Sequence, residues 1–328
     1  MSTAHLRELS RNILVLTVDI VMRAELARRR FVLAPARNRN RIEAHLPRVL
    51  NPEVTEASEP NNRLLYRELN QQNFLDYAEW LVAEVERVLG RERGLRIGEA
   101  PDRDGQYFHY LAMWIYALSR LGAIIPKYRA KALKVAKDIH PTFVIPGRGV
   151  IWKMREDLSA PYPGFGLGAL DPFHGYVVYR LLDETALADE IAQMKDIIER
   201  SYRSLVIGQD LGLGMMLWMT LFFPEEPWAR IHRERSLEVL NLMWIDPPGH
   251  FCREPGATMV KFAFTNHGVS LGLQAVAVWL ERVARLNSFF ETYRSGDEYD
   301  TEAITHVMAC VSYFPGEFIK PRDIYNRD

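Results

Sequence analysis

The sequence of 328 residues has few cysteines, almost no net charge and no long apolar run. Its two cysteines, Cys252 and Cys310, are too few for the disulfide framework of a small secreted protein, so we expect a reducing, cytoplasmic environment. A net charge of -1 argues against a nucleic-acid partner, because nucleic-acid binders carry a basic excess. The apolar run at 13–21 is shorter than a membrane span and lacks a signal-peptide cleavage site. We therefore expect a soluble protein.

Motifs for metals and phosphates are also missing. The nine histidines are scattered, and neither HExxH nor CxxC spacing occurs. The stretch GFGLG at 164–168 precedes a proline-containing turn and follows no strand of a βαβ unit, so it does not match a phosphate-binding loop. We therefore expect no metal and no cofactor.

What the sequence does contain is a recurring pair of helical patterns. An acidic or amide residue and a glycine open an unusually apolar helix, and a more polar amphipathic helix follows it. The apolar segments are 104–122, 171–183, 210–223 and 266–283, and the polar ones are 126–139, 187–205 and 227–244. A helix that is apolar on nearly every face must be surrounded by protein, whereas one with a polar stripe can face water. The alternation predicts an inner and an outer ring of helices.

Three more helical segments, 4–31, 73–90 and 301–314, complete the pattern. The total predicts an all-α fold, the (α/α)6 barrel or six-hairpin toroid, with residues 1–328 as a single domain. Segment 35–70 is rich in proline, asparagine and charge, and is predicted to wrap irregularly. Two β-branched runs flank PGRG within 142–154, which predicts a small β-hairpin over one mouth of the barrel. An irregular helical bundle is the alternative fold.

Acidic and polar residues stand at the starts of the four apolar helices. These residues are Asp104, Asp171, Asp210 and His267, placed where the helix dipole favours negative charge. Any one aspartate is explained by helix capping alone. Four such residues at one mouth favour a chemical role for at least one, because an acid in an apolar pocket has a raised pKa and donates a proton near neutral pH.

Aromatic side chains are plentiful near the same predicted mouth, although inner helices need large apolar side chains for their core in any case. Tyr107 and Tyr110 follow Asp104 at i+3 and i+6, close to one helix face. The candidate substrate-binding residues are Tyr107, Trp152, Phe165, Asp171, Phe173, His174 and Met215.

The loop IDPPGHFCREPGATMVKF, residues 245–262, brings Cys252 and Glu254 ahead of His267. Cys252 is either a packed thiol or a working base or nucleophile, and the second role requires a neighbouring cation or donor that stabilises the thiolate. The candidate catalytic residues are Asp104, Tyr110, Asp210, Cys252, Glu254 and His267.

This loop and the helix after it resemble linalool dehydratase-isomerase, in which a Cys-Glu-Pro loop leads into an inner helix that opens with an asparagine. Asp104 and Tyr110 stand where that family has an acid and a tyrosine on one helix, and Asp210 stands in place of its histidine. The resemblance implies the (α/α)6 fold, a central cavity and the dehydration or isomerisation of an isoprenoid-like alcohol.

Three functions remain open. The first is a lyase, isomerase or cyclase acting on a small hydrophobic substrate of the terpenoid type, favoured because GLGMMLWM and GVSLGLQAV supply few polar groups. Asp104 or Asp210 would donate the proton, and Cys252, Glu254 or His267 would accept it. The second is a glycoside hydrolase or related sugar-active enzyme with paired carboxylates. The third is a non-enzymatic helical binding protein. A homo-oligomer is compatible with each of these functions.

Overall fold

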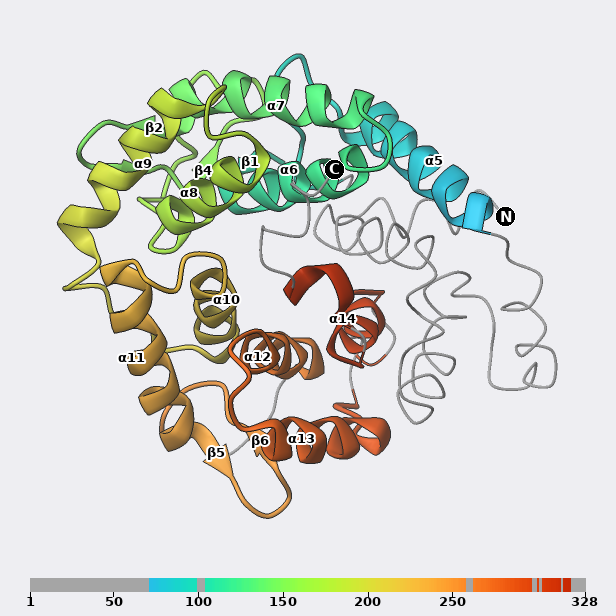
Figure 1. Ribbon diagram of the computed structural model, residues 1–328, viewed down its shortest axis with the longest axis vertical. Coiled ribbons are helices and arrows are strands. Elements are labelled where there is room, and N and C mark those ends of the chain that lie inside the picture. Colours follow the sequence, from blue (N-terminus) through green and yellow to red (C-terminus); the bar gives the residue numbers. More distant parts are fainter. Residues whose placement is uncertain are drawn as a thin grey trace. The chain divides into compact units, whose positions relative to one another are not determined.

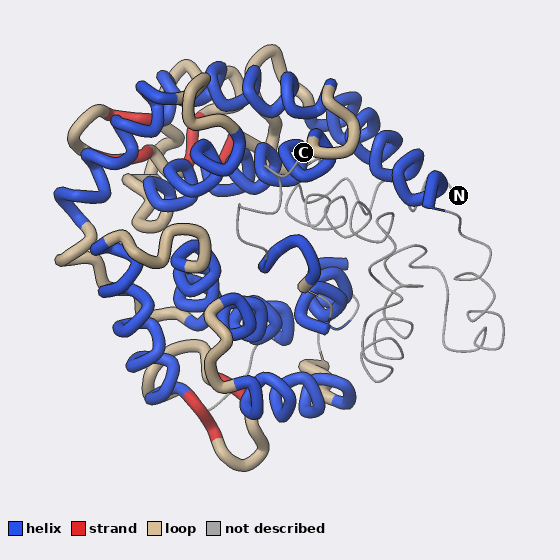
Figure 2. Tube along the Cα trace, in the orientation of Figure 1, coloured by secondary structure: helices blue, strands red, loops and turns tan. Residues whose placement is uncertain are grey.

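The structure is a computed structural model of the chain (Figure 1, Figure 2), and its described residues are 71–98, 104–257, 262–296, 300, 303–313 and 315–319. The helix predicted at 4–31 and the wrapping segment at 35–70 lie outside the described residues. The described part forms two compact units, which we call the first unit, residues 72–205, and the second unit, from residue 206 onward. The single-domain organisation stays a prediction.

Helices build the first unit. Helix α5 precedes two helical hairpins, α6 with α7 and α8 with α9, and α6 also packs against α8 (Figure 1). The bounds of these helices are Gln71–Leu89 for α5, Phe108–Gly122 for α6, Lys127–Phe143 for α7, Asp171–Leu182 for α8 and Ala188–Ser201 for α9. The helical patterns read from the sequence are confirmed here to within a few residues at each end.

The predicted alternation of apolar and polar helices is also present in the first unit. Helix α6 buries nearly every side chain, including Trp114 and Tyr116. Helix α7 instead buries one stripe, in which Tyr128, Ala132 and Ala136 recur at four-residue intervals. The two helices therefore differ as a surrounded helix differs from one that faces water on one side.

Short strands connect the helices of the first unit (Figure 2). Strand β2, Val144–Ile145, pairs antiparallel with β3, Gly149–Val150, which confirms the hairpin predicted within 142–154. Strand β4, Lys153–Met154, pairs with β1, Gln106–Tyr107, and so ties the end of the hairpin to the start of α6. This pairing corrects the helix predicted from residue 104: α6 begins at Phe108, because the preceding residues are engaged in a ladder.

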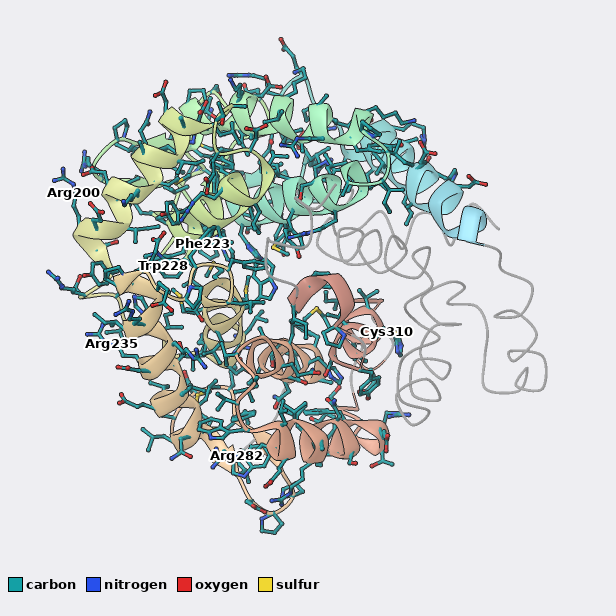
Figure 3. The ribbon with its side chains drawn as sticks, viewed as in Figure 1. Arg200, Phe223, Trp228, Arg235, Arg282 and Cys310 are labelled. Atoms are coloured by element: carbon teal, nitrogen blue, oxygen red, sulfur yellow. The ribbon has the colours of Figure 1, made fainter. Side chains whose placement is uncertain are left out.

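The second unit is built around α12, which packs against α10, α13 and α14. Glycines let α10 and α12 approach closely, since a Cβ on Gly272 would lie 2.2 Å from the carbonyl oxygen of Gly214. Buried Cys310 lies on α14 (Figure 3). The elements are α10 Asp210–Thr220, α11 Pro227–Met243, β5 Trp244–Ile245, β6 His250–Phe251, α12 Ala263–Ala275, α13 Leu280–Thr292, α14 Ala303–Tyr313 and the 3-10 helix η5 Gly316–Ile319.

One predicted helix proved to be two. The segment 266–283 breaks after Ala275, because Ala277 and Trp279 take left-handed backbone angles with φ of 54° and 52°. The chain then starts α13, which packs back against α12 as the polar partner that the sequence pattern had not revealed. No helix in the described part of the chain is long and apolar enough to cross a membrane.

Candidate active site

Asp171, the first residue of α8, lies almost completely buried at 5% exposure. Its carboxylate accepts hydrogen bonds from its own backbone N–H and from that of His109 in the first turn of α6. The Oδ1 atom has no hydrogen-bond partner within the described residues. Gly168 leaves room for the other oxygen, since a Cβ there would lie 1.8 Å from Oδ2. The backbone therefore fixes this carboxylate and leaves one of its oxygens unpaired.

Two imidazole rings accompany Asp171 at the starts of the same two helices. The rings of His109, on α6, and His174, on α8, have centroids 4.5 Å apart. His174 is 1% exposed, and His109 is half-buried. Both ring nitrogens of His174 and the Nδ1 of His109 find no hydrogen-bond partner in the part of the chain that the structure describes. We call Asp171, His109 and His174 the Asp171 cluster.

The three ionisable groups of the Asp171 cluster are shifted toward their neutral forms. Burial raises the pKa of Asp171 to about 7, although the backbone N–H donors oppose the rise. Burial lowers the pKa of His109 to about 4, and burial together with the neighbouring His109 lowers that of His174 well below its usual range. At neutral pH both imidazoles are uncharged, and each offers one donor and one acceptor. Asp171 changes its protonation state near neutral pH, as a general acid or base requires.

A cluster of unpaired, buried polar atoms destabilises the folded protein, so its presence favours a function for these atoms. Buried polar atoms in folded proteins are nearly always hydrogen-bonded, and each exception costs on the order of 1–3 kcal/mol. Perturbed pKa values gathered in one place are typical of functional sites. The Asp171 cluster is therefore the candidate active site of the first unit.

A row of aromatic rings leads away from the cluster. Tyr110 lies against His109, with ring centroids 5.6 Å apart, and Tyr107 lies edge-on to Tyr110 at 5.3 Å. Tyr107 in turn stacks on Trp152 at 5.7 Å and contacts Phe165 at 6.2 Å. The structure thus connects four of the sequence-predicted residues with His109, which the prediction had missed.

Asp104 lies beside this row in a separate polar arrangement. Its carboxylate accepts a hydrogen bond of 2.8 Å from the Tyr162 hydroxyl and lies 3.5 Å from the Lys153 ammonium group. The Tyr162 hydrogen bond and the charge of Lys153 lower the pKa of Asp104, even though burial opposes them. Asp104 was predicted as a proton donor, but a carboxyl held ionised does not suit that role.

Asp210 begins α10 in the second unit and is 2% exposed. Its carboxylate accepts the Leu211 backbone N–H at 2.7 Å and a hydrogen bond from the Thr265 hydroxyl. Its own backbone N–H bonds to the Arg253 carbonyl at 3.0 Å. Burial raises its pKa, while Thr265, Leu211 and the charge of Arg253 oppose the rise. Asp210 therefore ties the start of α10 to the loop before α12.

Cys252 is 1% exposed and belongs to an apolar cluster with Phe251, Leu213 and Leu286. Its thiol donates to the Glu254 backbone carbonyl at 3.1 Å. Burial raises its pKa, and the nearby acidic groups raise it further, so the thiolate is disfavoured. The side chain of Glu254 is exposed. These surroundings are those of a packed thiol.

The remaining predicted residues of the second unit are also built into its packing. His267 is buried and contacts the rings of Phe290 and Tyr313, with centroids 5.4 Å and 5.7 Å away. The adjacent Asn266 fixes the loop, because its side chain both accepts from the Phe251 N–H at 2.9 Å and donates to the Phe251 carbonyl at 3.0 Å. Met215 is half-buried on α10.

Sequence reasoning missed His109, Lys153 and Tyr162. One signal could have found the first: the dipeptide Phe-His occurs at 108–109 and again at 173–174, near the start of two successive apolar helices. Phe173 itself is core, with no exposed surface. Within the described residues no group of three or more His, Cys, Asp or Glu is arranged to hold a metal ion.

No protein-family model and no curated protein sequence matches the chain. Several solved structures are similar to it, and two of them are sugar enzymes. A D-mannose isomerase has a TM-score of 0.58 and 13% identity over 86% of this chain and 99% of that chain. The cellobiose 2-epimerase from Spirochaeta thermophila DSM 6192 has a TM-score of 0.57 and 13% identity over 93% of this chain and 88% of that one.

The chain has the (α/α)6 fold. The likeness confirms the fold class predicted from the sequence. It does not support linalool dehydratase-isomerase in particular, because the two structures described above are named for the isomerisation of mannose and the epimerisation of cellobiose.

Proposed function

We propose that this protein is an isomerase or epimerase that moves a proton at the carbon next to the carbonyl group of a sugar. The observation that carries the proposal is the Asp171 cluster, in which a carboxyl with a pKa of about 7 lies with two neutral imidazoles that have unpaired nitrogens. These are the groups that enolisation requires: one base for the C–H proton and neutral donors for the carbonyl oxygen.

The residues of the Asp171 cluster suffice for the proton transfers of the proposed reaction. The ionised Asp171 takes the proton from the carbon next to the carbonyl, the C–H electron pair forms the C=C bond of an enediolate, and the carbonyl π pair moves to the oxygen. An imidazole N–H of His109 or His174 stabilises the oxygen on which charge develops. Asp171 then gives its proton, or one exchanged with solvent, to the former carbonyl carbon. The hydroxyl proton on the neighbouring carbon passes through the imidazole to the former carbonyl oxygen, which gives the isomer. Return of a proton to the original carbon from the opposite face would need a second proton carrier and would give the epimer.

The D-mannose isomerase and the cellobiose 2-epimerase support a sugar over the hydrophobic substrate first favoured from the sequence. Both are named for enzymes of sugars, one an isomerase and the other an epimerase. Isomerisation and epimerisation share proton transfer next to a carbonyl, which fits an acid-base cluster better than it fits hydrolysis by paired carboxylates. The proposal therefore keeps the sugar-active alternative and replaces hydrolysis with proton transfer.

Deuterium uptake tests the proposal directly. The full chain would be incubated in D₂O with a panel of aldoses, ketoses and reducing disaccharides, and NMR would follow both product formation and deuterium at the carbon next to the carbonyl. We expect conversion of at least one sugar with deuterium incorporated there, and no uptake with Asp171→Asn. Absence of conversion and of exchange across the panel would refute the proposal.

A further inference from the structure

The side chain of Trp152 is exposed, although hydrogen bonds on both sides fix the backbone of this residue. Its carbonyl accepts the Phe108 N–H at 3.2 Å, and its own N–H donates to the Gly166 carbonyl at 3.0 Å. The residue is nevertheless 45% exposed. A fixed aromatic side chain that stays open to solvent is more typical of a binding surface than of core packing.

Two other rings hold the indole in place. Tyr107 stacks on it with an interplanar angle of 17°, and Phe165 meets it edge-on with ring centroids 5.3 Å apart. We call Trp152, Tyr107 and Phe165 the Trp152 platform. Because Tyr107 covers one face of the indole, the exposed surface lies on its remaining sides. The platform is therefore positioned before a ligand arrives.

Asp104 supplies a charged edge next to this platform. Phe165 lies 5.7 Å from the Tyr162 ring, and Tyr162 holds the Asp104 carboxylate. The Lys153 ammonium lies 3.7 Å above the Tyr162 ring and 5.1 Å from that of Phe165, which fixes the cation between the aromatic rings and the carboxylate. About a third of the Asp104 side chain is exposed, at 35%. Its oxygens retain lone pairs for further donors.

An apolar face beside a carboxylate matches one class of ligand. A sugar ring presents C–H groups on its face and hydroxyl groups around its edge, so it can stack on an indole while it donates hydrogen bonds to a carboxylate. A purely apolar ligand would desolvate Asp104 without replacing its hydrogen bonds, which is unfavourable. The combination therefore favours a saccharide.

The platform is separated from the Asp171 cluster. Two tyrosine rings, Tyr107 and Tyr110, lie between Trp152 and His109 in the row of contacts. One sugar ring therefore cannot occupy both places. When one ring reacts at the Asp171 cluster, a second ring of the same molecule can occupy the platform.

We propose that Trp152 and Asp104 form a subsite for a non-reacting sugar ring, so that the substrate is a disaccharide or longer saccharide. The second ring stacks on Trp152, and its hydroxyl groups donate to Asp104. This inference rests on the proposed function, because it names the substrate class of the same enzyme. It also explains why Asp104 is held ionised, since an ionised carboxylate is the stronger acceptor.

Binding measured without turnover tests the subsite. In the Asp171→Asn background, calorimetry would compare glucose with cellobiose and maltose. We expect at least one disaccharide to bind about tenfold or more tightly than glucose, the effect of one stacked ring and one charged hydrogen bond. Trp152→Ala should abolish this preference, Trp152→Phe should keep most of it, and Asp104→Asn should weaken disaccharide binding about tenfold. Leu242→Ala, which changes an exposed apolar residue of the second unit, is the control that should change nothing.

The outcomes separate the two proposals. A disaccharide preference that survives Trp152→Ala overturns the subsite, even when the wild-type chain exchanges deuterium. Failure of both disaccharides to bind also overturns it. If Trp152 governs binding while the wild-type chain shows no exchange, the subsite stands and the proton-transfer function fails.

Discussion

Asp171 and Asp210 are the same residue type at the same position of two apolar helices, yet their environments differ in one respect. Each is the first residue of its helix, each is buried, and burial raises the pKa of each. The carboxylate of Asp210 is bonded to Leu211 and Thr265. Asp171 keeps an unpaired oxygen, and the imidazoles of its cluster keep unpaired nitrogens, within the described residues.

The difference shows that burial and a raised pKa do not identify an active site on their own. Asp210 uses its hydrogen bonds to join α10 to the loop and to the first turns of α12, so structure accounts for its position. The backbone bonds of Asp171 account for only one of its oxygens. The polar atoms left unpaired in the Asp171 cluster are therefore what favours chemistry there.

Replacing each aspartate by asparagine gives the largest expected effect and tests the comparison directly. Asp171→Asn should lower kcat about 1000-fold, within the range for loss of a general acid or base. Asp210→Asn should keep its turnover and lose about 1 kcal/mol of unfolding free energy, because asparagine replaces only some of the hydrogen bonds. The measurements are steady-state kinetics on the sugar identified by deuterium uptake and denaturant unfolding of both variants. Comparable losses of turnover in the two variants would remove the distinction.

The pH dependence of turnover sharpens the assignment of the base. Ionised Asp171 is the reactive form, and its pKa is about 7. We therefore expect kcat/KM to fall about 50-fold from pH 7 to pH 5 and to level off above pH 8. The histidines cause no further change in kcat/KM near neutral pH, because the pKa of His109 is about 4 and that of His174 is also lowered. A profile that is flat from pH 5 to pH 8 would exclude Asp171 as the base.

Protein stability reports the same pKa without any substrate. Asp171 has an ordinary pKa of 3.8 and a folded pKa of about 7, so the folded state holds the proton over a range in which the unfolded state has lost it. Its contribution to stability is present below pH 4 and is lost as pH rises through 7.

Asp171→Asn removes the group whose titration lowers stability as the pH rises, so the variant does not lose this stability. The unfolding free energy of the variant minus that of the wild type should rise by roughly 2 kcal/mol between pH 5 and pH 7. The histidines titrate in the opposite sense, but they are present in both proteins and cancel in the difference. Urea titrations of both proteins at several pH values measure it, with Asp210→Asn as a parallel series. A difference that stays constant with pH would mean that Asp171 is not shifted.

Much of the fold could be read from the sequence because it depends on local periodicity. The apolar pattern of α6, the striped pattern of α7 and the PGRG turn each specify their own element. The break between α12 and α13 could not be read, because Ala277 and Trp279 adopt left-handed backbone that neither residue favours by itself. Packing of α13 on α12 accompanies that conformation.

The candidate site could be read only in part. Acidic residues at helix starts were recognised, but the sequences around Asp171 and Asp210 look alike in this respect. Which carboxylate keeps an unpaired oxygen depends on Thr265, 55 positions beyond Asp210, and on His109, 62 positions before Asp171. Lys153 was missed for a similar reason, since its partners Asp104 and Tyr162 reach it through strand pairing and a loop.

Cys252→Ala gives the smallest expected effect. It tests whether Cys252, in the second unit, is a packed thiol or a working base or nucleophile, which the sequence left open. The thiol lies among Phe251, Leu213 and Leu286 and donates to a backbone carbonyl, while burial raises its pKa. A thiol in such surroundings is inert, because the thiolate is the reactive form. Turnover should therefore stay within about twofold of wild type, while unfolding free energy falls by about 1 kcal/mol from the small cavity and the lost hydrogen bond.

Leu242→Ala, at a residue that is 72% exposed, is the control and should change neither turnover nor unfolding free energy. A loss of turnover of about 100-fold with unchanged stability would instead restore Cys252 as a working acid or base and would end the contrast between the two units.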